Sequence, residues 1–118
     1  MLIIASLLLV LCGFVHSILG ERYILIRLFK RDNLPHIFGS DQFTKGTLRF
    51  AWHITSLAWF GFAALLMLMP ESEILLVTVS IIFALSGVFS AYYTKGKHLS
   101  WLVFWLISVL TLASAVNG

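Results

Sequence analysis

The sequence predicts an all-α membrane protein: four transmembrane helices in an antiparallel bundle. Of its 118 residues, 60% are hydrophobic and only 11% are charged, and the mean hydropathy is +1.00. A soluble domain of this size needs more polar surface to cover its core. Four apolar segments also reach the roughly 20 residues with which a helix crosses a bilayer. The length allows one domain, residues 1–118.

Each predicted span has a recognisable beginning or end. The first starts without a positive n-region or a clear small-residue cleavage site, so we expect a retained helix rather than a signal peptide. Pro70 follows the second span, and Gly96 lies in the turn after the third, where both residue types break helices. The predicted spans are about residues 2–22, 48–69, 74–94 and 99–117.

Only one connection is long, residues 23–47. Its first part, up to Arg31, alternates apolar and basic residues. This pattern fits either a continuation of the first helix or a helix on the membrane surface, and the sequence leaves both open. The remainder is rich in turn-forming residues, and we expect a loop there.

The distribution of charge predicts the orientation. All eight Lys and Arg residues fall in or beside the first and third connections, whereas the second carries only Glu71 and Glu73. By the positive-inside rule the basic connections are cytoplasmic, and both termini are then periplasmic in a bacterial inner membrane. The basic side also attracts anionic lipid headgroups, so the basic isoelectric point requires no nucleic acid. The cationic residues are Arg22, Arg27, Lys30, Arg31, Lys45, Arg49, Lys95 and Lys97.

Ionisable residues at matched depth in the first two spans form the candidate site. If the boundaries lie near residues 22 and 47, His16 and His53 each lie roughly 9 Å inside the membrane. Consecutive antiparallel helices are usually neighbours, so we expect the two histidines to face one another. Glu21 and Arg49 are natural partners across the same helices, because charged groups in a span usually pair.

Four interpretations of this cluster compete. The first is a hydrogen-bonded lock between helices, formed by His16, Glu21, Arg49, His53 and neighbouring serines. In the second, His16, Glu21, His53 and His98 bind zinc, iron or copper, with His36 as an alternative fourth ligand, although no HExxH spacing supports it. In the third, His16 and His53 hold a haem whose propionate meets Arg49. The fourth is a small transport site or a site for a lipid or quinone headgroup.

From these alternatives we favour a small membrane protein that binds a metal ion or haem. A non-enzymatic structural or accessory subunit is the alternative, and a small transporter or headgroup binder is the third option. The sequence has no nucleophile elbow, phosphate loop or deep carboxylate pair, so it assigns no catalytic residue. We expect Trp52 to sit at the headgroup level, as tryptophans near span ends do.

The segments HSILGER and LRFAWHITSLAW resemble those of small, uncharacterised bacterial four-span membrane proteins. The resemblance covers residues 16–59 and carries no established activity. On the third span a stripe of small residues fits either the core of the bundle or contact with a second copy in a homodimer or larger membrane complex. The stripe comprises Ser80, Ala84, Gly87 and Ala91.

Overall fold

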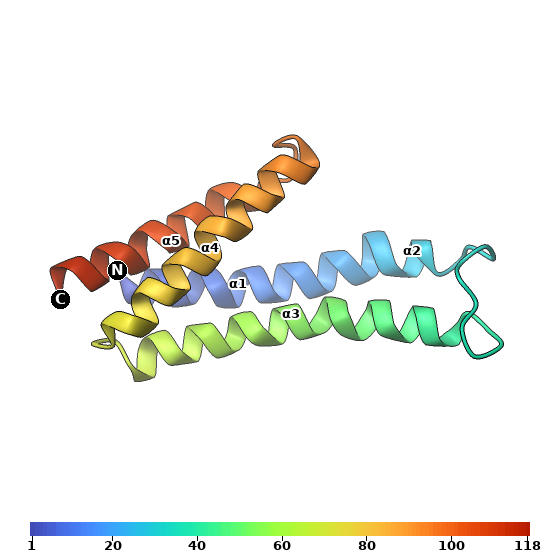
Figure 1. Cartoon of the computed structure of the whole chain (residues 1–118), viewed down its shortest axis with the longest axis horizontal. Coiled ribbons are helices and arrows are strands. Elements are labelled where there is room, and N and C mark those ends of the chain that lie inside the picture. Colours follow the sequence, from blue (N-terminus) through green and yellow to red (C-terminus); the bar gives the residue numbers. More distant parts are fainter. The chain divides into compact units, whose positions relative to one another are not determined.

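The computed structural model describes residues 1–118 and contains helices without any β-strand (Figure 1). The first three elements are continuous and form one helical segment, Leu2–Leu28. This segment, α3, α4 and α5 are each long and apolar enough to cross a membrane, judged by length and composition. The elements are α1 (Leu2–Gly20), the π-helix η1 (Glu21–Leu25), α2 (Ile26–Leu28), α3 (Gln42–Leu68), α4 (Glu73–Thr94) and α5 (Ser100–Asn117).

The first two helical segments extend further into the long connection than predicted. The first continues to Leu28 instead of ending near residue 22, so residues 23–28 prolong the helix. The second begins at Gln42 instead of residue 48. Ser40 explains this earlier start in part, because its hydroxyl accepts a hydrogen bond from the Gln42 amide at 3.3 Å and so satisfies a free donor of the first turn.

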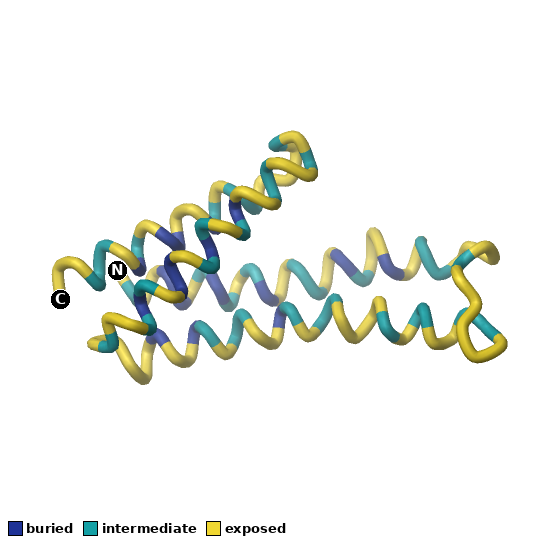
Figure 2. The backbone as a smooth tube through the Cα atoms, viewed as in Figure 1, coloured by how far each residue is buried: buried dark blue, intermediate teal, exposed yellow.

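The chain divides into two compact units. The hairpin unit is residues 11–60, and the terminal unit is residues 1–10 together with 61–118. The hairpin unit contains the long connection and the parts of α1 and α3 that flank it. Figure 2 shows buried positions recurring along the helices, with the connections and much of the helical surface exposed. The antiparallel bundle and membrane insertion stay predictions.

Pairing of α4 with α5 organises the terminal unit. The Ser80 hydroxyl donates to the Ser108 carbonyl at 2.9 Å, and the Ser108 hydroxyl donates to the Ser80 carbonyl at 2.8 Å. Both serines are buried, and Phe83 lies fully buried beside them against the Phe104 ring at 5.6 Å. Reciprocal hydrogen bonds of this kind give apolar helices a fixed register.

Small residues let an aromatic side chain approach the backbone of α4. The Trp105 indole donates to the Ala84 carbonyl at 3.2 Å, and the ring lies where a Cβ at position 87 would stand. Gly87 therefore makes room for the indole. The stripe of small residues predicted on this helix thus contacts α5 at Ser80, Ala84 and Gly87.

We expect Gly87→Ala to destabilise the protein by about 1–3 kcal/mol, because the added methyl group overlaps Trp105. The matched control is Gly61→Ala, whose methyl group would meet nothing within 4 Å and should be neutral or stabilising, because alanine favours helix. The measurement is unfolding by SDS in detergent micelles, followed by circular dichroism. Equal stability of the two variants would contradict the packing role of Gly87.

Candidate functional site

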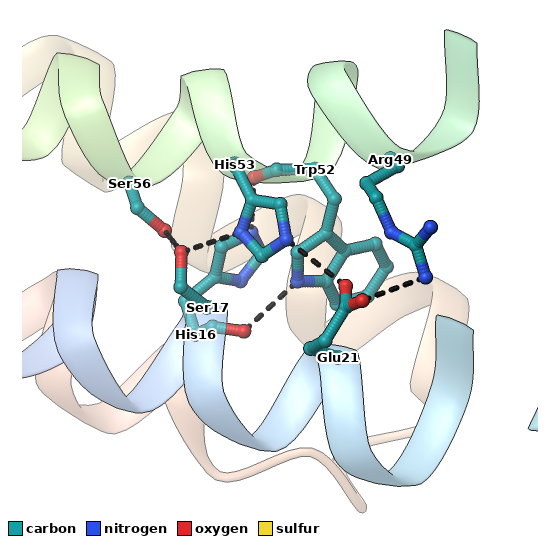
Figure 3. A network of polar contacts seen from close by, with 7 residues as sticks. All are labelled: His16, Ser17, Glu21, Arg49, Trp52, His53 and Ser56. Carbon is teal, nitrogen blue, oxygen red and sulfur yellow. Dashed lines mark hydrogen bonds and ion pairs between the residues drawn. The ribbon is translucent and has the colours of Figure 1, made fainter. Parts of the chain in front are cut away.

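A polar network joins the two sides of the hairpin unit (Figure 3). α1 and η1 supply residues on one helical face, and α3 supplies residues spaced by three, four and seven positions, which also share one face. The two faces meet through hydrogen bonds between side chains and backbone. The members are His16, Ser17, Glu21, Arg49, Trp52, His53 and Ser56.

The Glu21 carboxylate lies at the centre of the charged part. One carboxylate oxygen binds Arg49 Nη2 at 2.7 Å, and the other binds His53 Nε2 at 3.0 Å. The side chains of Glu21, His53 and Arg49 are 28%, 37% and 47% exposed. The guanidinium also lies over the Phe29 ring, 4.9 Å from its centroid, which adds a cation–π contact.

A chain of hydroxyl groups continues from His53 in the other direction. His53 Nδ1 lies 2.9 Å from the Ser17 hydroxyl, and that hydroxyl donates to Ser56 Oγ at 2.7 Å. Both ring nitrogens of His53 therefore have partners within the hairpin unit. The hydrogen bonds run without interruption from Ser56 through Ser17 and His53 to Glu21.

The Ser17 hydroxyl is the adjustable part of this chain. It donates to Ser56 Oγ or can turn to donate to His53 Nδ1, which lies 2.9 Å away. The Glu21 carboxylate only accepts, so the hydrogen between it and His53 comes from Nε2.

His16 and Trp52 form a second, reciprocal contact beside this chain. The Trp52 indole donates to the His16 carbonyl at 2.9 Å, and His16 Nε2 donates to the Trp52 carbonyl at 3.1 Å. Their rings stack with centroids 4.7 Å apart and planes within 3°. The indole occupies the space that a Cβ at Gly20 would need, so a glycine again admits a tryptophan between two helices.

The π-helix η1 begins at the central carboxylate. The Ile26 amide bonds to the Glu21 carbonyl, five residues back instead of four. Such a turn holds more residues than an α-helical turn and is frequent at functional sites. The residues after Glu21 are consequently rotated about the helix axis relative to an unbroken α-helix.

The structure brings some of the predicted site residues together and separates others. Glu21, Arg49 and His53 are in direct contact, and His16 joins the same network through Trp52. His98 belongs to the terminal unit, where its ring accepts from the Ser100 amide at 3.3 Å.

The predicted set of metal ligands is not gathered into a metal centre. No group of three or more His, Cys, Asp or Glu side chains is arranged to hold a metal ion. His36, the alternative fourth ligand, contacts the Leu34 carbonyl within the connection at 3.0 Å. Coordination of a metal ion or haem iron by His53 would break one of its two existing hydrogen bonds.

Sequence reasoning missed three features of the site. The first is the hydrogen bond from the Trp52 indole to the His16 carbonyl; the headgroup level of Trp52 stays a prediction. The sequence feature that points to this contact is Gly20, four residues after His16, because a glycine leaves room for a large side chain from a neighbouring helix. The cation–π contact with Phe29 and the π-helix at Glu21 had no signal, because both depend on how the helix ends in three dimensions.

Comparisons with known proteins add no family to this description. The chain matches no protein-family model, no curated protein and no solved structure.

We predict that Glu21 and His53 are energetically coupled. Glu21→Gln and His53→Gln should each lower stability, and the double variant should lose about 0.5–1.5 kcal/mol less than the sum of the two. The measurement is a double-mutant cycle in detergent micelles with SDS as denaturant.

The control for the change in net charge is Glu71→Gln, in the turn between α3 and α4, which we expect to be neutral. Additive losses at Glu21 and His53, or an equal loss in the Glu71 variant, would contradict the coupling.

Proposed function

We propose that this chain is a small multi-pass protein of a bacterial inner membrane and acts as a non-enzymatic structural or accessory subunit. In this proposal the polar network clamps the first two spans together. The hypothesis of metal or haem binding is the principal competitor.

The proposal rests on the observation that the hydrogen-bonding groups of Glu21 and His53 already have partners. Both oxygens of Glu21 and both ring nitrogens of His53 already have partners inside the hairpin unit. No buried polar side-chain atom in the chain lacks a hydrogen-bond partner. A catalytic or cofactor site usually keeps a donor, an acceptor or a coordination position open for its ligand. A fully satisfied network is typical of an interhelical lock.

The exposed surface supports residence in a membrane. Along α1, large apolar side chains such as Ile3, Leu7 and Leu11 are more than half exposed. Soluble proteins rarely expose extended apolar surface of this kind, whereas lipid covers it without cost. The distribution of Lys and Arg supports cytoplasmic placement of the first and third connections.

Absorption and elemental analysis of the purified protein separate the lock from cofactor binding. We expect a colourless preparation with zinc, iron and copper far below one per chain. A Soret band that His16→Ala and His53→Ala both abolish would establish haem and overturn the proposal. Stoichiometric metal that is lost in Glu21→Gln would overturn it in favour of a metal site.

Reporter fusions test the predicted orientation. Fusions after Leu34 and after Lys97 should be active with a cytoplasmic reporter, such as a fluorescent protein that folds only there. Fusions after Glu71 and at Gly118 should be active with an alkaline phosphatase reporter, which requires the periplasm. The reverse pattern, or mixed activity at one site, would contradict the orientation inferred from the basic residues.

A further inference from the structure

Two arginines converge on one tyrosine where the helix leaves the polar network. The Arg22 guanidinium carbon lies 5.9 Å from the centroid of the Tyr23 ring, and that of Arg27 lies 5.4 Å from it. Both distances are typical of cation–π contacts. All three residues are exposed, so the group is accessible from outside the chain.

The π-helix explains why residues 22 and 27 lie on the same side. In an α-helix, residues five apart are separated by roughly 140° around the axis. In η1 the hydrogen bonds join residues five apart, as from Ile26 to Glu21, so such residues stack along the axis. The π turn at Glu21–Leu25 thus brings Arg22 and Arg27 to one side. Tyr23 contacts Arg27 across a spacing of four residues, which makes side chains neighbours in an α-helix as well.

The two guanidiniums have no anionic partner within the chain. The ion pairs of the structure involve Lys45 with Asp41, and Arg49 and His53 with Glu21. Two unpaired positive charges at one ring repel each other, and this repulsion is relieved when an anion lies between them. Planar guanidiniums bind phosphate oxygens in a bidentate manner, which makes a phosphate the fitting anion.

We propose that Arg22, Tyr23 and Arg27 form a binding site for the phosphate of an anionic phospholipid headgroup. The inference rests on the proposed function, in which this end of the helix emerges at the cytoplasmic leaflet. Arg22 lies at the predicted end of the first span, so we expect its side chain at the depth of the lipid phosphates. Tyrosine favours the same level, because its ring is apolar and its hydroxyl polar. Anionic lipids are concentrated in that leaflet.

Neighbouring cations in the same connection provide the matched control. Lys30 and Arg31 carry the same total charge, and Arg31 Nε donates to the Asn33 side chain at 3.0 Å. They contribute only to the general attraction between a basic loop and an anionic surface. Replacing this pair therefore removes equal charge without touching the tyrosine cluster.

Lipid binding to the purified full chain in detergent micelles tests the site. Native mass spectrometry during titration gives apparent affinities for phosphatidylglycerol, phosphatidylcholine and inorganic phosphate. We expect phosphatidylglycerol to bind at least tenfold more tightly than the other two. The double variant Arg22→Gln/Arg27→Gln should lose at least tenfold in that affinity, and Lys30→Gln/Arg31→Gln less than threefold.

Three results would overturn the inference. Equal losses in the two double variants would show diffuse attraction instead of a site. Equal affinity for phosphatidylcholine would remove the preference for an anionic headgroup. Inorganic phosphate binding as tightly as phosphatidylglycerol would identify a site for free phosphate.

The conservative variant Arg22→Lys/Arg27→Lys tests the role of the guanidinium shape. Its affinity for phosphatidylglycerol should lie between that of wild type and that of the glutamine variant, because lysine keeps the charge but lacks the planar fork.

Two further measurements keep the result interpretable. The circular dichroism of Arg22→Gln/Arg27→Gln should match wild type. If it does not, Tyr23→Leu replaces it, with an expected loss of at least threefold in phosphatidylglycerol affinity. Resistance of wild-type protein to alkaline extraction from membranes tests the proposed function separately. A protein that resists extraction but shows no lipid preference overturns the lipid site alone.

Discussion

The pairing of the Glu21 carboxylate is the interaction on which the hairpin unit depends. An ionised carboxylate within an apolar helix is costly unless cationic or hydrogen-bonding groups surround it. Arg49 and His53 supply both kinds of partner, one to each oxygen. Because the partners lie one turn apart on α3, the carboxylate fixes the rotation and the height of α3 against α1. The other polar contacts of the network occur in the register that this pairing imposes.

Both units pair two helices through a tryptophan that packs beside a glycine. In each unit a tryptophan indole donates to a backbone carbonyl of a neighbouring helix, next to a glycine that leaves room for the ring. Trp52 does so at Gly20, and Trp105 does so at Gly87. The indole thereby combines a large apolar contact with one directed hydrogen bond. When all helices are apolar, hydrophobic burial favours no particular partner or register. Directed contacts of this kind then specify which helices are neighbours and in which register they pack.

Local composition was sufficient to predict the helices but insufficient to predict the geometry of the site. Four apolar runs imply four long helices, and breaks such as Pro70 give their ends on the short connections to within a few residues. The contact of Glu21 with Arg49 followed from opposite charges at matched depth. The contact of Glu21 with His53 belongs to the predicted helix lock, whereas the facing of His16 and His53 stays a prediction. Depth alone does not give the angle of a side chain about its helix, so the sequence could not specify which nitrogen meets which partner.

The π-helix has a consequence for how this protein tolerates changes in chain length. A π turn contains about one residue more than an α turn, so deleting one residue between Glu21 and Leu25 could restore a regular α-helix. Such a deletion would leave His16 and Ser17 unmoved. It would also leave Arg27 and Phe29 close to their present directions, because five residues in a π turn and four residues in an α turn both complete about one revolution. The basic end of the hairpin therefore keeps its orientation whether or not the extra residue is present.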